Sequence, residues 1–464
     1  MEKSSQKKHI SKREVKVKTF SVPFIFENLK ENISISTNMK PQISKEQIRN
    51  LAFKFDSQGN ISEASKYYQY FINQGFEDYR VFLNYGAMLI KLGKLKEAEI
   101  LTKKAIKLKP DCAIGHTNLG FIFLRNENYK LSLKYYSEGA KLNCLAREGE
   151  NLESNNLRFK SISKYKIKHD IEQFEYLASQ GYETKKFTSL ATLYKKIADE
   201  INWPSETEII NLSNRYYSTL KGNYNRLIHQ IESTRLKEEA VNNSLDIERI
   251  TSDYFDHEYG LTYIDNFLSP KALKSLRDFL LGSTIWFNIL YKGGYLGTNL
   301  KEGLANPLIF QIAEELKNKF PKIFKNHAIK QIWAYKYDSQ AKKTGSKLSG
   351  IHPHADEGKI TFNFWITPDQ ANLNPSSGGL VIHSLEAPNE WNYDYQNSHK
   401  HDLDHIQNEL KRSKGPTEII PYKENRAVIF NSRLFHETDN YEFKDGYENR
   451  RINVTMLFGK RSNA

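Results

Sequence analysis

The sequence predicts a multidomain α + β protein, in which an α-helical repeat region precedes a region of short β-strands. Three observations support this fold class. Small residues recur every 34 residues between about 45 and 145, helical periodicity continues to about 255, and strand-like runs separated by Gly, Pro, Ser and Asn clusters follow. With 464 residues, 39% of them hydrophobic, the chain can bury more than one core.

The chain is basic, but its charge is dispersed. The formal net charge is +13, yet the lysines alternate with glutamates instead of forming one patch with aromatic residues, which does not favour a nucleic-acid partner. Residues 1–40 begin with a basic stretch without the apolar core of a secretory signal, and we expect a disordered tail there.

No run approaches the roughly 20 apolar residues of a membrane helix. The two cysteines, Cys112 and Cys144, form neither a close pair nor a set of four, which disfavours a disulfide scaffold or a thiolate zinc site. We therefore expect a soluble, cytoplasmic protein without a membrane partner.

Three copies of a repeat are visible in the first third of the chain. Small residues occupy equivalent positions: Ala52, Gly86 and Gly120; Ala64, Ala98 and Ser132; and, at the turn between paired helices, Gly59 and Gly93. The middle copy, "NYGAMLIKLGKLKEAEILTKKAIKLKP", resembles the tetratricopeptide repeat, with Gly86, Ala98, Ala105 and Pro110 at its small and proline positions. The resemblance implies a short solenoid over residues 41–147 that presents a concave surface to a protein or peptide partner. Packing against a neighbouring domain is the alternative.

Residues 148–255 keep a helical pattern. One apolar face contains Ile167, Ile171, Phe174 and Leu177, and another contains Leu190, Leu193 and Ile197. We expect a helical extension or linker without chemistry of its own, in which His169 and His229 serve packing.

The region 256–464 changes to strands. Two helices are predicted, one after the capping pair Ser269 and Pro270 and one after Pro307. The strand candidates are "GLTYIDNFL", "IWAYKY", "KITFNFWIT", "GGLVIH", "RAVIF" and "RINVTMLF". Many short strands without intervening helices are typical of a sandwich or barrel.

The stretch "HPHADEGKITFNFWIT" contains the main chemical signal. His354 and Asp356 alternate, so in an extended chain they share a face, and His436 follows in "NSRLFHETD". Two imidazoles and one carboxylate leave coordination positions open, which suits ferrous iron. An arginine in "RRINVTMLF" offers a fork that matches a carboxylate.

These residues resemble the iron(II) and 2-oxoglutarate dependent dioxygenases, especially their prolyl-hydroxylase-like branch, whose pattern is His-x-Asp, a distant His, then Arg on the last core strand. The resemblance covers residues 256–464. It implies a double-stranded β-helix (jelly-roll) domain, Fe(II) held by the catalytic residues His354, Asp356 and His436, and 2-oxoglutarate and O2 as cosubstrates.

The same resemblance predicts the cosubstrate residues. Arg451, Asn453 and Thr455 alternate on one face, which favours Arg451 over Arg450 as the partner of the distal carboxylate. Tyr337 resembles a family tyrosine near the cosubstrate, and Asn363 is a candidate for the pocket lining.

Two other metal sets are open in the sequence. His352 and His354 are also two apart, although an all-histidine set would leave Arg451 unexplained. Residues 384–415 resemble an insertion in which His399, His401 and His405 offer another site, but we expect a solvated lid there.

The predicted function is hydroxylation of a C–H bond, with a protein or peptide side chain as substrate and the repeats presenting it. The alternatives are a small-molecule hydroxylase of the same class, a catalytically inactive interaction scaffold and a cupin-like metal enzyme that does not use 2-oxoglutarate. The sequence does not predict the oligomeric state.

Overall fold

A computed structural model describes residues 43–144, 157–205, 208–289, 294–338, 350–391, 404–412 and 417–460. The predicted tail, 1–40, lies outside them. The chain divides into two compact units, Met1–Asn118 and Leu119–Ala464, and this division falls within helix α5 (Ala113–Arg125). The domain boundaries expected after 40, 147 and 255 stay predictions. No helix in the described ranges is long and apolar enough to cross a bilayer.

The first unit contains two helical pairs. They are α1 (Lys45–Ser57) with α2 (Ile61–Asn73) and α3 (Tyr79–Lys91) with α4 (Leu95–Leu108). Ala52, Ala64 and Ala98 are fully buried. A Cβ atom at Gly86 would lie 2.8 Å from Thr102 Oγ1, so α3 and α4 approach too closely there for a side chain. The close helix contacts predicted from the spacing of small residues are therefore confirmed at these positions.

The turns within the pairs share one backbone conformation. Gly59 and Gly93 have φ of +70° and +74°, and Glu127, one period further on, has φ of +56°. A glycine adopts this left-handed conformation without steric cost, whereas a glutamate is less favourable there. The Glu127 carboxylate forms an ion pair with Lys317 Nζ, which gives this residue a role that glycine could not fill.

The second unit begins with the rest of α5 and contains all remaining helices and strands. The described α-helices are α6 (Tyr129–Cys144), α7 (Lys164–Ser179), α8 (Thr184–Glu200), α9 (Asn214–Leu220), α10 (Ile247–Asp256), α11 (Pro270–Gly282), α12 (Pro307–Lys319), α13 (Pro321–Phe324) and α15 (Asp404–Arg412). The 3₁₀ turns are Leu157–Phe159, Leu300–Glu302, Asp369–Ala371 and Tyr447–Asn449. Ser269 caps α11 by accepting a hydrogen bond from Ala272 N, as its sequence predicted.

Two antiparallel sheets form the centre of this unit. The six-stranded sheet has the order β3 (Leu261–Ile264), β9 (Ala427–Asn431), β6 (Ile360–Trp365), β11 (Ile452–Phe458), β5 (Ile329–Tyr337), β4 (Tyr295–Asn299). The three-stranded sheet has the order β10 (Leu434–Thr438), β7 (Leu380–Glu386), β8 (Thr417–Ile420). A short ribbon pairs β1 (Ser161–Ile162) with β2 (Ile210–Asn211). The described strands form no closed barrel, so the double-stranded β-helix stays a prediction.

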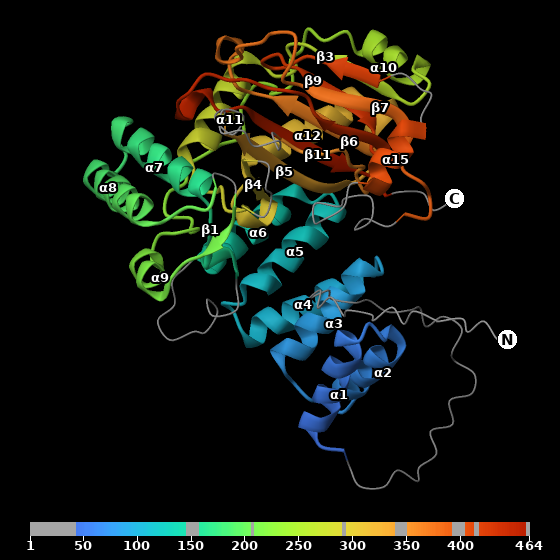
Figure 1. Ribbon diagram of the computed structural model, residues 1–464. Helices are drawn as coiled ribbons and strands as arrows, with labels where there is room; N and C mark the ends of the chain where they lie inside the picture. The colour runs from blue at the N-terminus through green and yellow to red at the C-terminus, as the bar shows by residue number, and fades with distance from the viewer. Residues whose placement is uncertain are drawn as a thin grey trace, which may run out of the picture. The chain divides into compact units, whose positions relative to one another are not determined.

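Helices pack on the outer face of the six-stranded sheet. Figure 1 shows α11 and α12 against this sheet, and their apolar residues share one buried cluster with residues of β5, β6 and β11. Leu124 and Tyr136, from the third helical pair, belong to the same cluster. The ring of Tyr129 stacks on Phe310 of α12 at 5.7 Å between centroids. The third pair is therefore part of the core of the second unit.

A buried polar cluster joins α7 to the sheet region. Gln173 Nε2 and Lys336 Nζ both donate to Tyr447 Oη, each at 2.8 Å. Arg450 Nε donates to Glu172 Oε2 at 2.9 Å. Burial, followed by the charge of Arg450, lowers the pKa of Lys336 well below its ordinary value. The predicted helical extension is thus integral to the second unit.

The helical pattern expected throughout 148–255 is wrong between Leu220 and Ile247, where the described chain contains no helix. Backbone groups of this segment instead donate to polar side chains of α12 and to the hydroxyls of Ser283 and Thr284. Glu315 Oε2 accepts from the backbone N–H groups of Ala240 (2.7 Å) and Val241 (2.8 Å). These tertiary hydrogen bonds replace those that a helix would have made.

Replacing Gly120 by Ala should destabilise the second unit. The new Cβ would lie 2.8 to 3.0 Å from ring atoms of the buried Tyr136, so we expect a loss of about 1–3 kcal/mol in the free energy of unfolding. Urea unfolding should show a lower midpoint with an unchanged slope.

The matched control is Gly222→Ala, because a Cβ there meets nothing within 4 Å. Its effect should stay within about 0.5 kcal/mol. Equal midpoints for the two variants would contradict the close approach of α5 and α6.

Candidate metal site and cavity

Two segments far apart in sequence bring the predicted metal ligands together. His436 lies in β10, and His354 forms an isolated antiparallel bridge with it. The N–H of His354 donates to His436 O (3.0 Å), and the N–H of His436 donates to His354 O (2.9 Å). The backbone N–H of Asp356 donates to Ser432 O at 2.8 Å. Backbone pairing therefore fixes the spacing of the three side chains.

The three side chains point toward a common centre. Their potential ligand atoms lie within 4.8 Å of one another. His354 Nε2 is 4.0 Å from Asp356 Oδ1, and His436 Nε2 is 3.6 Å from Asp356 Oδ2. The Nδ1 atoms of the two rings lie 2.8 and 2.9 Å from the carbonyl oxygens of His352 and Leu434. Because a carbonyl only accepts, each Nδ1 carries the hydrogen and each neutral ring keeps an Nε2 lone pair for a metal.

Burial favours the neutral form of both histidines, which metal binding requires. Burial, and next the charge of His436, lowers the pKa of His354 to about 4. Burial likewise lowers the pKa of His436, although the Asp356 carboxylate opposes this effect. Two neutral imidazoles and one carboxylate fit a divalent first-row metal such as ferrous iron, with positions left for other ligands.

Hydroxyl groups orient the Asp356 carboxylate. Thr361 Oγ1, on β6, donates to Asp356 Oδ2 at 2.8 Å, and Ser432 Oγ lies 3.0 Å from the same hydroxyl. All three side chains are buried. Thr361 was not among the residues predicted from the sequence, although it alternates with Asn363 on the strand that follows Asp356, so strand periodicity offered the signal.

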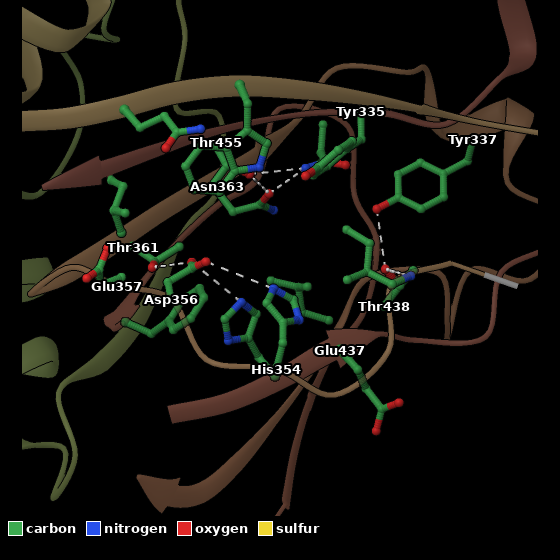
Figure 2. A pocket seen from close by; sticks show the side chains of 18 of the residues that line it. Tyr335, Tyr337, His354, Asp356, Glu357, Thr361, Asn363, Glu437, Thr438 and Thr455 are labelled. Atoms are coloured by element: carbon green, nitrogen blue, oxygen red, sulfur yellow. Dashed lines mark hydrogen bonds and ion pairs between the residues drawn. The ribbon is translucent and has the colours of Figure 1, made fainter. Parts of the chain in front are cut away.

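A cavity of ≈ 280 Å³ adjoins the ligands. Residues that alternate along two neighbouring strands line it: Gln331, Trp333, Tyr335 and Tyr337 on β5, and Asn453, Thr455 and Leu457 on β11. Figure 2 shows His354 and Asp356 turned toward each other on one side of this cavity and Tyr337 with Thr438 on another, whereas Glu437 points away. The metal ligands thus face a space large enough for a small ligand.

Arg451 lies against this cavity and is almost completely buried, with 1% of its surface exposed. Its Nε donates to Gly378 O (2.7 Å) and its Nη2 to Gly379 O (3.1 Å). A Cβ at Gly379 would lie 1.8 Å from Ile420 O, so only glycine fits where this turn passes the end of β8. No carboxylate of the described residues lies within ion-pair distance of Arg451.

Arg450 faces the opposite side. It is 2.9 Å from Glu172 Oε2 and 3.7 Å from Asp338 Oδ1, and it does not line the cavity. Alternation along the chain therefore separates the two arginines as expected, with only Arg451 beside the cavity.

Tyr337 and Asn363 also line the cavity. Tyr337 Oη is 3.3 Å from Thr438 Oγ1, and the Arg451 guanidinium lies 4.5 Å from the centre of its ring. Asn363 Oδ1 accepts from Asn453 Nδ2 (2.8 Å) and Thr455 Oγ1 (2.9 Å). These bonds set the orientation of the amide, and its buried Nδ2 has no partner among the described residues.

The alternative metal sets are not assembled in the described residues. His352 supplies its carbonyl to His354 but does not belong to the ligand cluster. His399 and His401 lie outside the described residues, and His405 packs against Trp391 with ring centres 5.1 Å apart. The insertion expected at 384 begins later, because β7 continues to Glu386. Most of α15 is exposed, as expected for a solvated lid, but its Ile406 is fully buried, so one face of the helix packs against the protein.

No protein-family model and no curated protein sequence matches this chain. Solved structures do match in part. A prolyl-4-hydroxylase from Pseudomonas putida covers 47% of this chain and 100% of its own, with 13% identity and a TM-score of 0.29. HygX from Streptomyces hygroscopicus, solved with nickel, 2-oxoglutarate and hygromycin B, covers 46% of this chain and 87% of its own, with 11% identity and a TM-score of 0.32.

The TPR2B domain of yeast Sti1, solved in a complex with pHsp70, covers 24% of this chain and 88% of its own, with 21% identity and a TM-score of 0.21. The epimerase SnoN was solved with Fe3+, alpha ketoglutarate and nogalamycin RO. The cofactors predicted for this chain are iron and 2-oxoglutarate; SnoN was solved with Fe3+ and HygX with nickel, each together with 2-oxoglutarate, and this chain has a His-Asp-His site. At such low identities and TM-scores, the likenesses establish no activity for this chain.

Replacing Thr361 by Val should weaken metal binding. The substitution removes the hydroxyl that orients Asp356 and keeps the shape of the side chain. Loss of a hydrogen bond behind a ligand typically costs about 10- to 100-fold in metal affinity, and we expect a loss in this range. Anaerobic competition between the protein and a chelator for Co(II) or Fe(II) measures it.

Thr298→Val is the matched control. Thr298 is buried in β4, and its Oγ1 has no partner among the described residues, so its hydroxyl can be removed without loss of a bond. Its metal affinity should equal that of the wild type. If both variants bind metal equally well, Thr361 does not orient the ligand.

Proposed function

We propose that this chain is an iron(II) and 2-oxoglutarate dependent oxygenase that hydroxylates a C–H bond. His354, Asp356 and His436 would hold the iron, and Arg451 would bind the distal carboxylate of 2-oxoglutarate. The observation that carries the proposal is the juxtaposition of a His-Asp-His cluster and a buried arginine along one cavity.

The electrostatics of Arg451 support an anionic ligand. Taking a guanidinium out of water is costly unless an anion compensates it, and the oxygens of Gly378, Gly379 and Asn453 that accept from Arg451 are neutral. A carboxylate in the cavity would accept two parallel hydrogen bonds from the guanidinium fork. A dicarboxylic 2-oxoacid has a carboxylate for the arginine at one end and metal-binding oxygens at the other.

Other residues have roles that follow from their positions. The hydroxyls of Tyr337 and Thr438 lie beside the arginine and would bind the same distal carboxylate. The free Nδ2 donor of Asn363 would bind an oxygen of the cosubstrate nearer the metal. Bound ferrous iron would supply the redox chemistry that couples decarboxylation of 2-oxoglutarate by O2 to hydroxylation of the substrate. The protein's task is to orient the reactants and to exclude water from the buried site.

We propose a protein or peptide side chain as the substrate. The support is the helical repeat pattern of the first unit, because tetratricopeptide-like pairs commonly bind extended segments of a partner. The same cavity would also serve a small-molecule hydroxylase. A third possibility, an inactive scaffold, would keep the fold without turnover.

The iron-loaded protein should consume 2-oxoglutarate and form succinate under air. Asp356→Ala removes a proposed metal ligand. The loss of a residue that only hydrogen-bonds to a ligand costs up to about 100-fold in activity, so we expect consumption of 2-oxoglutarate to fall by more than this. Glu357→Ala is the matched control, because this neighbouring carboxylate lines the cavity but pairs with Lys330. It should keep most of the activity. Chromatographic assay of succinate measures both.

The substrate classes differ in what stimulates this reaction. The macromolecular fraction of a cell extract should increase consumption if the substrate is a protein, and the small-molecule fraction should do so if it is a metabolite. A wild-type protein that binds iron and 2-oxoglutarate but stays inactive with either fraction would indicate a scaffold. A protein that binds no iron would refute the proposed function.

Arg451→Met should remove the preference for a dicarboxylate. We expect the wild type to bind 2-oxoglutarate more tightly than 2-oxopentanoate, which has a methyl group in place of the distal carboxylate. Charge-assisted hydrogen bonds of about 1.5–3 kcal/mol correspond to a preference of roughly 10- to 100-fold, which the variant should lose. Titration calorimetry on the metal-loaded protein measures it.

Lys330→Met is the control for charge alone, because Lys330 is a cation of the same cavity that is already paired with Glu357. This variant should keep the preference. A preference retained in Arg451→Met would place the distal carboxylate elsewhere.

A further inference from the structure

Residues 387–391 and α15 lie behind the proposed metal ligands. Ile406 of α15 forms a fully buried apolar cluster with Ala355, Ala387 and Phe435. Ala355 lies between the ligands His354 and Asp356 in the chain, and Phe435 directly precedes His436. Neighbouring side chains in extended backbone point to opposite faces, so the ligands face the cavity while the residues next to them face α15.

Further contacts attach this segment to the strands that carry the ligands. The ring of Trp391 packs edge-on against Phe435, with centres 6.0 Å apart. The N–H of Ala387 donates to Arg433 O (2.8 Å), and Arg433 Nη2 donates to Ala387 O (2.7 Å). Arg433 lies in the turn between β9 and β10. Ala387 is therefore tied to the turn that leads into β10, the strand that contains His436.

The apolar cluster around Ile406 is small, so each of its residues contributes a large share of the packing. Four fully buried residues form it, with Leu385, Trp391 and Leu410 packed against them. On the described part of α15, Ile406 is the one residue that is fully buried. Two of the four cluster residues, Ala355 and Phe435, are adjacent in sequence to the proposed metal ligands. A gap at Ile406 would let Ala355 and Phe435 shift, and the ligand atoms would shift with them.

We propose that residues 387–391 together with α15 brace the metal ligands from behind, and that Ile406 is a positioning residue for the metal site. The inference rests on the proposed metal binding by His354, Asp356 and His436. It assigns to the inserted segment a structural task at the metal site, whereas the sequence indicated a solvated lid.

Ile406→Ala tests the brace by metal affinity. The substitution removes the apolar contact with Ala355 and Phe435 and leaves the ligands in place. We expect affinity for Co(II) to fall about 10-fold, the lower range for groups that support a ligand. The visible absorption spectrum of bound Co(II) should change as well, because it reports the ligand geometry. Anaerobic competition with a chelator gives the affinity without any turnover.

Three variants separate positioning from general destabilisation. Leu316→Ala truncates an equally buried aliphatic residue of α12, away from the site, and should lower the Tm without changing Co(II) affinity or spectrum. Asn408→Ala changes an exposed residue of α15 and should change neither. Ile406→Val removes a single methylene group, so it keeps the fold and should weaken Co(II) binding by a smaller factor.

The outcomes discriminate between the proposals. If the wild type binds no Co(II), the proposed metal site fails. If the wild type binds Co(II) and both variants of Ile406 match its affinity and spectrum, only the brace fails. An equal loss of affinity in Leu316→Ala would also overturn the brace, because the effect would then follow stability and not position.

Discussion

The site depends on the alternation of side chains along extended backbone. Each proposed functional residue has a chain neighbour that points to the opposite face and is fixed there. Ala355 and Phe435 adjoin the metal ligands and pack against α15. Lys336 adjoins Tyr337, and Arg450 adjoins Arg451, and both are held in the polar cluster at α7. The side chains on one face of the backbone thus hold it in place, and the proposed functional side chains lie on the other face.

This arrangement distributes the support of the site between different parts of the unit. The proposed metal ligands are supported by the apolar cluster around Ile406, and apolar contacts tolerate small changes in the orientation of the side chains. The arginine end is backed by hydrogen bonds and ion pairs, which are directional. The polar cluster includes the pair of Glu172 with Arg450, whose members are separated by more than half of the chain. A helical segment that the sequence marked as a linker therefore contributes to the geometry of the cavity.

The sequence predicted those features that depend on local spacing. The interval between His354 and Asp356, and the alternation of Arg451 with Asn453, indicated shared faces that the structure contains. The six strand candidates correspond to strands of the six-stranded and three-stranded sheets, whereas β1, β2, β4, β8 and β10 were not among them. β8 is short and partly exposed, so its apolar pattern is weak. The roles of the site residues stay predictions.

Features that depend on tertiary contacts could not be predicted. The pattern of α15 indicates an amphipathic helix but not that Ile406 meets Ala355 and Phe435, which are distant in sequence. Likewise, part of the backbone of residues 221–246 finds its hydrogen-bond partners on α12, and no local signal reveals Glu315 as an acceptor. Asn363 was a candidate from its strand position, but only the bonds of its oxygen show that its nitrogen has no partner among the described residues.

The third helical pair has a consequence for how the repeats can evolve. Its spacing is that of the other copies, yet Leu124 and Tyr136 lie in the core of the second unit, and Glu127 replaces the turn glycine to pair with Lys317. Selection on this copy therefore acts through the stability of the unit that holds the cavity. The first two copies belong to a separate compact unit, so substitutions in them act on a different core from the one that holds the cavity.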